Sequence, residues 1–192
     1  VRLAKDYPGP PAIRFPRTST PKKDSEHPAR AFSVGEAELL VDGRDGCLLA
    51  YGAMVYHALD VAAQIEKKHG KKLAVVNARF AKPLDARTVE REFSRQPVIF
   101  SLEDHQKAGG FGAAVLEHAS ERGLDSRKLD IIAIDDRWID HGQRIEALAM
   151  AGLDVPSLVA RVERRLSLSE PSSQPAVGAP ASANAVLRSS DA

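Results

Sequence analysis

Cysteine is almost absent from this chain of 192 residues, which contains only Cys47. A single cysteine cannot form an internal disulfide, and the absence of disulfides is typical of reducing compartments. We therefore expect a cytoplasmic protein. Cys47 lies within an apolar run, and this position favours a small core residue over a reactive nucleophile.

Long apolar runs are also missing. No stretch approaches the roughly 20 consecutive apolar residues that a membrane-spanning helix needs, and no signal peptide is recognisable. Neither sign of charge dominates, since 27 Lys and Arg residues stand against 26 Asp and Glu residues. This balance argues against a broad nucleic-acid or acidic-membrane footprint. The first residue is Val1 rather than methionine, so we expect a fragment, a processed product or a trimmed chain.

Composition divides the chain into three zones. Residues 1–31 are rich in Pro, Lys and Arg and show no sustained helix or strand period. Residues 32–166 alternate short apolar runs with amphipathic segments, as a folded domain does. Residues 167–192 consist mostly of Ser, Ala, Pro and Gly. Such a tail buries too little apolar surface to offset the entropy of ordering, and we predict that it is disordered.

The middle zone predicts strands that alternate with helices. Strands are expected at 37–41, 47–53, 72–78, 96–103 and 129–135, and helices at 54–70, 82–95, 109–123, 142–152 and 153–166. The first two strands flank a Gly-rich turn, DGRDG, which predicts that they pair as an antiparallel hairpin. The alternation that follows indicates an α/β layered domain with a mostly parallel sheet and one antiparallel strand. Asp85 and Asp154 are predicted helix N-caps.

The densest polar cluster is LEDHQKAGGFG, in which an acidic segment follows a strand and glycines open the next helix. Its residues of interest are Glu103, Asp104, His105, Gly109, Gly110 and Gly112. Ligands of parallel sheets bind at the carboxyl ends of strands, and N–H groups at a helix start can hold an anion, so one interpretation is a site for a small anionic ligand. The other is structural: the glycines let the helix pack close to the sheet, and the acids meet a neighbouring subunit.

A second polar segment, IDDRWIDHG, follows the last predicted strand. Asp135, Asp136, Asp140 and His141 are candidate metal ligands. Their spacing matches no known metal cage, however, and Arg137 interrupts the acids. The alternative is a polar loop whose tryptophan, Trp138, is packed or lies at an interface.

No recognisable catalytic motif accompanies these clusters. The sequence contains neither a nucleophile elbow nor a His-Glu-x-x-His motif. His57 and His69, in the first predicted helix, are expected at the surface or at an edge. By site chemistry alone, the chain is therefore interpreted as a non-catalytic α/β module.

Six segments, taken in order, resemble the carboxyl-terminal third of the 1-deoxy-D-xylulose-5-phosphate synthases. They are GPPAIRFPR, LLAYGAMVYHALDVA, VVNARFAKPLD, VIFSLEDHQKAGGFGAAV, DDRWIDHG and AGLDVPSLVARVERRL. The synthases are members of the transketolase-like family, whose enzymes use thiamine diphosphate, and the resemblance covers roughly residues 7–166. RFAKPLD is also shared with transketolases and dehydrogenase beta-subunits, whereas DRWIDHG and the segment after it are similar to the synthases in particular.

The resemblance implies a division of the chain. Residues 35–166 would form a transketolase carboxyl-terminal domain, a three-layer sandwich, after a linker at 21–34. Residues 1–20 would be the end of the preceding pyrimidine-binding domain, and residues 167–192 the disordered tail. Within Arg-Phe-Pro-Arg, the resemblance assigns Arg17 to the phosphate of glyceraldehyde 3-phosphate, a role that suits a planar guanidinium.

The resemblance also implies an activity for the whole enzyme. A synthase of this kind condenses pyruvate with glyceraldehyde 3-phosphate, releases carbon dioxide and feeds isoprenoid and thiamine synthesis. Its thiamine diphosphate and Mg²⁺ sites lie in upstream domains, so this chain would hold no catalytic, cofactor-binding or metal-binding residue and would be inactive alone. Its partners would be those upstream domains, a second copy in a homodimer and small-molecule substrates, with no nucleic acid and no membrane.

Two other functions remain open at this point. One is a stand-alone, non-catalytic interaction module. The other is the equivalent domain of a transketolase or of a dehydrogenase beta-subunit.

Overall fold

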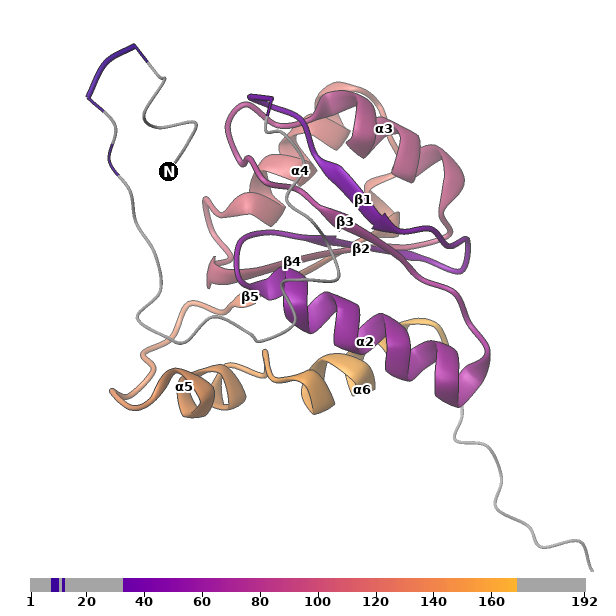
Figure 1. Ribbon diagram of the computed structural model, residues 1–192, viewed down its shortest axis with the longest axis vertical. Coiled ribbons are helices and arrows are strands. Elements are labelled where there is room, and N and C mark those ends of the chain that lie inside the picture. Colours follow the sequence, from indigo (N-terminus) through magenta and orange to yellow (C-terminus); the bar gives the residue numbers. More distant parts are fainter. Residues whose placement is uncertain (1–7, 11, 13–32, 169–192) are drawn as a thin grey trace, which may run out of the picture.

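The computed structural model describes residues 8–10, 12 and 33–168. Within them a five-stranded sheet carries helices on both faces (Figure 1). The strands are β1 Glu38–Val41, β2 Cys47–Ala50, β3 Ala74–Asn77, β4 Ile99–Gln106 and β5 Leu129–Ile134. The helices are α2 Met54–His69, α3 Ala86–Arg95, α4 Phe111–Glu121, α5 Arg144–Met150 and α6 Val155–Arg165, with a short 3-10 turn at Ser126–Lys128. Arg17 and residues 169–192 of the predicted tail lie outside the described residues.

The sheet has the strand order β1-β3-β2-β4-β5. β1 runs antiparallel to β3, and every other neighbouring pair is parallel. The predicted fold class, α/β with a mostly parallel sheet and one antiparallel strand, is therefore confirmed. The chain crosses over between β3 and β4, so that β4 and β5 lie on the other side of β2 from β3.

The predicted hairpin of the first two strands is wrong, because β3 lies between β1 and β2. The connection between them passes across the start of β3, where the backbone N–H groups of Arg44 and Asp45 both donate to the carbonyl of Lys72, at 3.0 and 3.1 Å. A side chain at Gly43 would place its Cβ 2.6 Å from the nitrogen of Ala74. Glycine in the β1–β2 connection therefore lets this segment pass close to the backbone of β3, and it does not form a tight turn between two paired strands.

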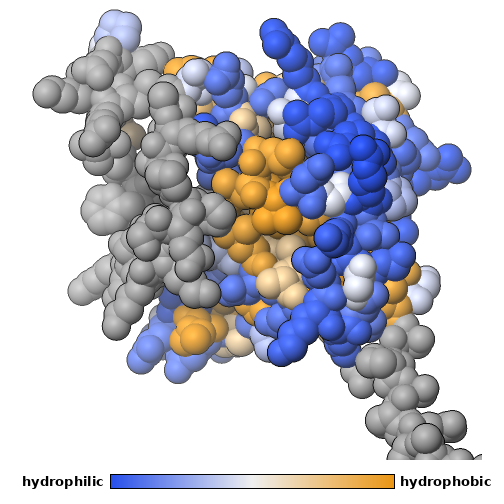
Figure 2. All heavy atoms as spheres, turned by 45° about the vertical axis from the view of Figure 1, so that its right-hand side comes forward, coloured by the Kyte–Doolittle hydropathy of each residue, from blue (hydrophilic) through white to orange (hydrophobic). Residues whose placement is uncertain are grey.

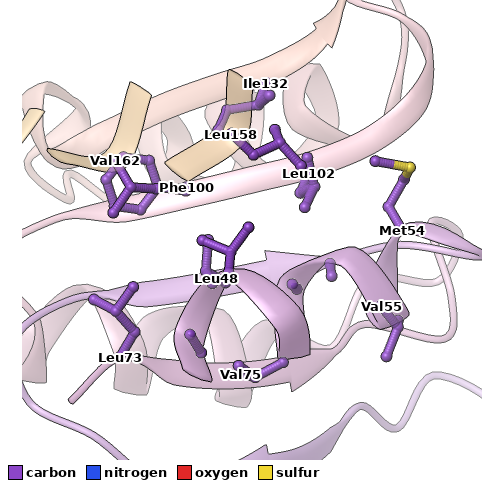
Figure 3. Close-up of a cluster of buried hydrophobic side chains, with 14 of the residues drawn as sticks. Leu48, Met54, Val55, Leu73, Val75, Phe100, Leu102, Ile132, Leu158 and Val162 are labelled. Atoms are coloured by element: carbon purple, nitrogen blue, oxygen red, sulfur yellow. The ribbon is translucent and has the colours of Figure 1, made fainter. Parts of the chain in front are cut away.

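Two hydrophobic cores lie on the two faces of the sheet. One contains residues of α2, α5 and α6, and Figure 3 shows Leu158 and Val162 of α6 near Phe100 and Leu102 of β4. The other contains residues of α3 and α4. Side chains alternate between the two faces of a strand. In β2, Cys47 and Leu49 therefore belong to the core of α3 and α4, and Leu48 belongs to the core of α2, α5 and α6. These layers form the predicted three-layer sandwich.

Cys47 is fully buried, as expected for a small core residue. Burial raises the pKa of its thiol well above the ordinary value, because the thiolate would lose its hydration. The thiol is therefore held in its neutral, unreactive form.

The helix ends agree with the sequence in most details. The side chain of Asp85 accepts from the backbone N–H of Thr88 at 3.0 Å and caps α3. Asp154 occupies the N-cap position of α6, but its side chain makes no capping hydrogen bond. His69, which was expected at the surface or at an edge, lies at the end of α2 with a side chain that is only 7% exposed, 2.7 Å from a carboxylate oxygen of Glu163. This contact joins the end of α2 to α6.

Among the described helices, none combines the length and the hydrophobicity that a membrane span requires. The face seen in Figure 2 carries a central hydrophobic region with hydrophilic residues along its right-hand side. Hydrophobic side chains thus reach the surface at several places, and the most exposed large ones among the described residues are Trp138, at 98%, and Ile145, at 72%.

Candidate functional site

The two polar segments that the sequence singles out meet at one edge of the sheet. β4 and β5 are parallel neighbours, so their carboxyl ends lie together. The backbone N–H of Lys107, just after β4, donates to the carbonyl of Ile134 at the end of β5, at 2.9 Å. The edge formed by these ends is where an open parallel sheet usually binds its ligands.

Glu103 points under the start of α4 rather than into solvent. Its side chain is 1% exposed, and its two carboxylate oxygens accept hydrogen bonds from the backbone N–H groups of Phe111 and Gly112, at 2.7 and 2.8 Å. A negative charge at a helix N-terminus is stabilising. The anion that the sequence predicts at this helix start is therefore a carboxylate of the chain itself, and these N–H groups are not available to a ligand.

The glycines of this motif allow the close approach that the carboxylate needs. A Cβ on Gly110 would lie 2.6 Å from Oε2 of Glu103. A Cβ on Gly112 would lie 2.5 Å from Oγ of Ser101 and 2.6 Å from Cγ2 of Ile131. The helix is therefore held against β4 and β5 at a distance that only glycine permits, and this part of the structural interpretation is confirmed.

Asp104 forms an ion pair within the chain, with the guanidinium of Arg144 on α5, at 2.5 Å. His57 of α2 lies near this pair. Its pKa is lowered, first by burial and then by the positive charge of Arg144, so the imidazole is neutral at physiological pH. His105 is exposed and makes only a long contact, 3.4 Å, with the carbonyl of Gln106. The three neighbouring residues of the acidic segment thus have three different environments.

The residues proposed as metal ligands do not form a metal site. Asp135 and Asp136 are exposed, and Asp135 lies 3.9 Å from the amino group of Lys107. In the part of the chain that the structure describes, no group of three or more His, Cys, Asp or Glu side chains is placed to hold a metal ion. The polar-loop interpretation of this segment is the one that the structure supports.

A hollow of about 420 Å³ lies at this edge, beside the ion pair of Asp104 and Arg144. It is lined by Asp104, Gln106, Ile134, Arg137, Trp138, Ile139, Asp140, His141, Gly142, Arg144, Ala147, Leu148 and Ala151. The structure thus brings Asp104, Asp140 and His141 to one hollow and leaves Glu103 buried outside it. The sequence did not single out Arg144, and an arginine at a helix start gave no signal that it would meet an acid at the end of β4.

These side chains hold elements together rather than present reactive groups. The carboxylate of Glu103 accepts hydrogen bonds from the start of α4, and the carboxylate of Asp104 forms an ion pair with Arg144. None of the described candidates combines a nucleophile with a base or a set of metal ligands.

Comparison with known proteins agrees with this architecture. The family model of the transketolase C-terminal domain matches residues 35–158. A 1-deoxy-D-xylulose-5-phosphate synthase of Pelotomaculum thermopropionicum is 38% identical over 164 residues, which are 85% of this chain and 26% of that protein. For 1-deoxy-D-xylulose-5-phosphate synthase 1 of Geobacter metallireducens the identity is 37% over 159 residues, 83% of this chain and 25% of that protein. The chain thus spans about a quarter of the length of these relatives.

Solved structures show the same fold. A split-gene transketolase, described as an inactive β4 tetramer, superposes with a TM-score of 0.63 and 28% identity over 73% of this chain and 44% of that one. A transketolase of Pichia stipitis, 19% identical, shares the fold with a TM-score of 0.50 over 69% of this chain and 18% of that one. The resemblance to the carboxyl-terminal part of the synthases is confirmed. By its fold and by the match over residues 35–158, the chain belongs to the transketolase C-terminal domain family.

Proposed function

We propose that this chain is the carboxyl-terminal part of a 1-deoxy-D-xylulose-5-phosphate synthase. The complete enzyme condenses pyruvate with glyceraldehyde 3-phosphate and releases carbon dioxide, which supplies precursors of isoprenoids and thiamine. The observation that carries the proposal is the 38% identity to a synthase over 85% of the chain. The two transketolase structures compared above are less similar in sequence, at 28% and 19% identity.

The described residues do not fit thiamine diphosphate or its Mg²⁺. A diphosphate needs free N–H groups or cations, but the N–H groups at the start of α4 are taken by Glu103. The acids of the 135–140 loop do not converge, and the described part of the chain offers no cluster of metal ligands. The proposal therefore assigns the cofactor and the metal to upstream domains and derives no catalytic step in this chain.

In this proposal, residues 35–166 form the carboxyl-terminal domain, which packs against upstream domains and supports a homodimer. Residues 1–20 close the pyrimidine-binding domain, and residues 21–34 link the two. Arg17, which lies outside the described residues, binds the phosphate of glyceraldehyde 3-phosphate. The whole enzyme works in the cytoplasm on small-molecule substrates.

The test begins with the genomic sequence before Val1. We expect the reading frame to continue upstream through a Gly-Asp-Gly magnesium motif. The protein of the complete frame, given thiamine diphosphate and Mg²⁺, should form 1-deoxy-D-xylulose 5-phosphate from pyruvate and glyceraldehyde 3-phosphate. A start codon at or near Val1, with no upstream frame, would instead support a stand-alone interaction module.

A further inference from the structure

Most of the exposed large hydrophobic side chains of the described residues lie at one edge of the sheet. There are seven such side chains: Val34, Leu39, Tyr56, Leu116, Trp138, Ile145 and Met150. All but Leu39, within β1, and Leu116, on α4, belong to segments at the carboxyl ends of the parallel strands. We call the other five the carboxyl-edge surface. Exposed apolar side chains that gather on one side of a soluble domain mark an interaction site.

The topology places four of these five side chains where strands end. Tyr56 is in the first turn of α2, just after β2, and Trp138 is in the connection that follows β5. The next two belong to α5. This helix lies at the same edge, because Arg144 at its start forms an ion pair with Asp104 of β4, at 2.5 Å.

The chain also enters the domain at this edge. β1 runs antiparallel to β3, and its first residue, Glu38, lies opposite Asn77, the last residue of β3. The segment before β1 is held there, since the backbone N–H of Ala37 donates to the side chain of Asp85, at the start of α3, at 2.9 Å. Val34, on this incoming segment, is 51% exposed. The part of the chain that precedes residue 33 is therefore attached at the carboxyl edge.

The opposite edge of the sheet has a different character. α2 and α6 both end there, where His69 lies 2.7 Å from a carboxylate oxygen of Glu163. Exposed cations surround these ends: Lys67, Lys68, Lys71, Lys72, Arg127, Arg164 and Arg165. None of the seven exposed large hydrophobic side chains of the described residues belongs to these segments. Burial of so many charges would be costly, so this edge suits water, whereas the carboxyl edge suits a partner.

The chemistry of the carboxyl-edge surface favours an apolar partner. Beside Trp138 lies the hollow of about 420 Å³, and its lining includes Ile134, Ile139 and Leu148. The two arginines of the hollow are already engaged, Arg144 with Asp104 and Arg137 with the carbonyl of Met150. Tryptophan side chains are frequent energetic centres of protein interfaces. We therefore expect a partner that offers an apolar face to the indole and an apolar side chain to the hollow.

We propose that, in the complete protein, the carboxyl-edge surface is buried against the domain that precedes it in the chain, with Trp138 at the centre of the contact. The inference rests on the proposed function, which supplies that domain, and it names the surface. This chain spans about a quarter of the length of the relatives compared above. A linker at 21–34 reaches at most about 50 Å when fully extended. The preceding domain therefore stays close to this edge, and an intramolecular contact has a high effective concentration.

Hydroxyl-radical footprinting with mass spectrometry tests this contact, because it measures how fast Trp138 is modified by a reagent in the solvent. We expect Trp138 to be modified several-fold more slowly in the complete protein than in the 192-residue chain. Because the contact is intramolecular, its protection should be the same at about 1 and about 100 µM protein. The peptide that carries Leu116, which is 40% exposed on α4, is the internal control and should be modified at equal rates in both proteins.

A charge placed on the carboxyl-edge surface should open the contact. Ile145→Glu in the complete protein should raise the modification rate of Trp138 towards the rate in the 192-residue chain, since a carboxylate is costly to bury. Ile145 is 72% exposed, so the variant should keep the fold of the domain, and circular dichroism of the 192-residue variant checks this. Leu116→Glu is the matched control, because it makes the same change outside the surface. It should leave Trp138 protected.

Three results would overturn the inference. The first is equal modification of Trp138 in the complete protein and in the 192-residue chain. The second is protection that already appears in the 192-residue chain and grows with concentration, which would indicate a second copy. The third is a reading frame that begins near Val1, because it leaves no preceding domain.

The activity of the complete protein separates this inference from the proposed function. Synthase activity in a complete protein whose Trp138 is as reactive as in the 192-residue chain defeats the inference alone. Protection of Trp138 in a complete protein that lacks synthase activity defeats the proposed function alone.

Discussion

The carboxylate of Glu103 accepts a hydrogen bond from the backbone N–H of Gly112 at 2.8 Å, and a second one comes from Phe111 at 2.7 Å. Through this contact, β4 supplies the negative charge that the start of α4 stabilises. The acid-then-glycine motif is thus one structural unit. The glycines let the start of α4 lie close to β4, and the carboxylate of Glu103 accepts hydrogen bonds from that helix start.

Replacement of Glu103 by glutamine should destabilise the domain by about 2 kcal/mol, because hydrogen bonds to a charged acceptor are replaced by a neutral amide whose NH₂ faces a donor. Urea unfolding followed by circular dichroism measures this change. Glu117→Gln, on the exposed side of the same helix, should change stability by less than about 0.5 kcal/mol. Equal effects of the two variants would show that the buried carboxylate does not stabilise the helix start.

Gly112→Ala should cost about 1–3 kcal/mol, because its Cβ would lie 2.5 Å from Oγ of Ser101 and overpack the contact of α4 with the sheet. Gly142→Ala is a suitable comparison, since its Cβ would meet only the side chain of Glu146, at 3.0 Å from Oε2 and 3.9 Å from Cβ, and no backbone atom or strand residue. The free energies of unfolding of the Gly112→Ala and Gly142→Ala variants, measured by urea unfolding, test whether the close contact at Gly112 requires glycine. A tolerated alanine at Gly112 would mean that the helix shifts away from the sheet at little cost.

The fold class could be predicted from the sequence, but two details could not: that β1 pairs with β3 rather than with β2, and that the side chain of Glu103 binds the start of α4. The apolar runs and the turn predicted the opposite directions of β1 and β2, yet the insertion of β3 depends on a crossing at Gly43 that the local sequence does not reveal. The sequence also predicted an anion at the start of α4. It did not show that Glu103, eight residues earlier, would be that anion.

The ion contacts between α2 and α6 should make stability depend on pH. Hydrogen bonds from His69 and then Lys68 lower the pKa of Glu163 below its ordinary value of 4.5. A carboxyl group with a lowered folded-state pKa contributes its full stability above the ordinary value and loses it as pH falls through the folded-state value.

Glu163→Gln should therefore reduce stability at pH 7 by roughly 1 kcal/mol. The difference from the unchanged chain should shrink as the pH falls below 4.5 and through the lowered folded-state pKa of Glu163. Urea midpoints measured from pH 7 to pH 3 test this. Glu121→Gln, an exposed change on α4, should give a small difference at every pH. A Glu163→Gln difference that persisted in acid would indicate a packing effect rather than a charge effect.

The proposed role of Arg17 in binding the substrate phosphate is tested in the complete protein. Arg17→Ala should lower kcat/KM for glyceraldehyde 3-phosphate by about ten- to a few-hundred-fold, because a charged hydrogen bond is worth roughly 1.5–3 kcal/mol. Arg17→Lys should recover only part of this, since an ammonium cannot make the paired contact. For glyceraldehyde, which has no phosphate, the loss should be far smaller.

Arg14→Ala is the control for that experiment, because it removes the other arginine of the same segment. It should leave the preference for the phosphorylated acceptor unchanged. If Arg17→Ala lowered activity equally with both acceptors while the protein remained folded, Arg17 would have a structural role and no contact with the phosphate.

The most direct test of the central claim is a choice of donor substrates offered to the complete protein. Thiamine diphosphate, Mg²⁺ and two acceptors, glyceraldehyde 3-phosphate and ribose 5-phosphate, are present. Xylulose 5-phosphate and pyruvate that is isotope-labelled at its ketone carbon are supplied together, and the products are followed by NMR. We predict that the label enters 1-deoxy-D-xylulose 5-phosphate, with one carbon dioxide released for each molecule formed, while xylulose 5-phosphate and ribose 5-phosphate are left unchanged. Consumption of xylulose 5-phosphate and ribose 5-phosphate with the pyruvate untouched would contradict the account and identify a transketolase instead.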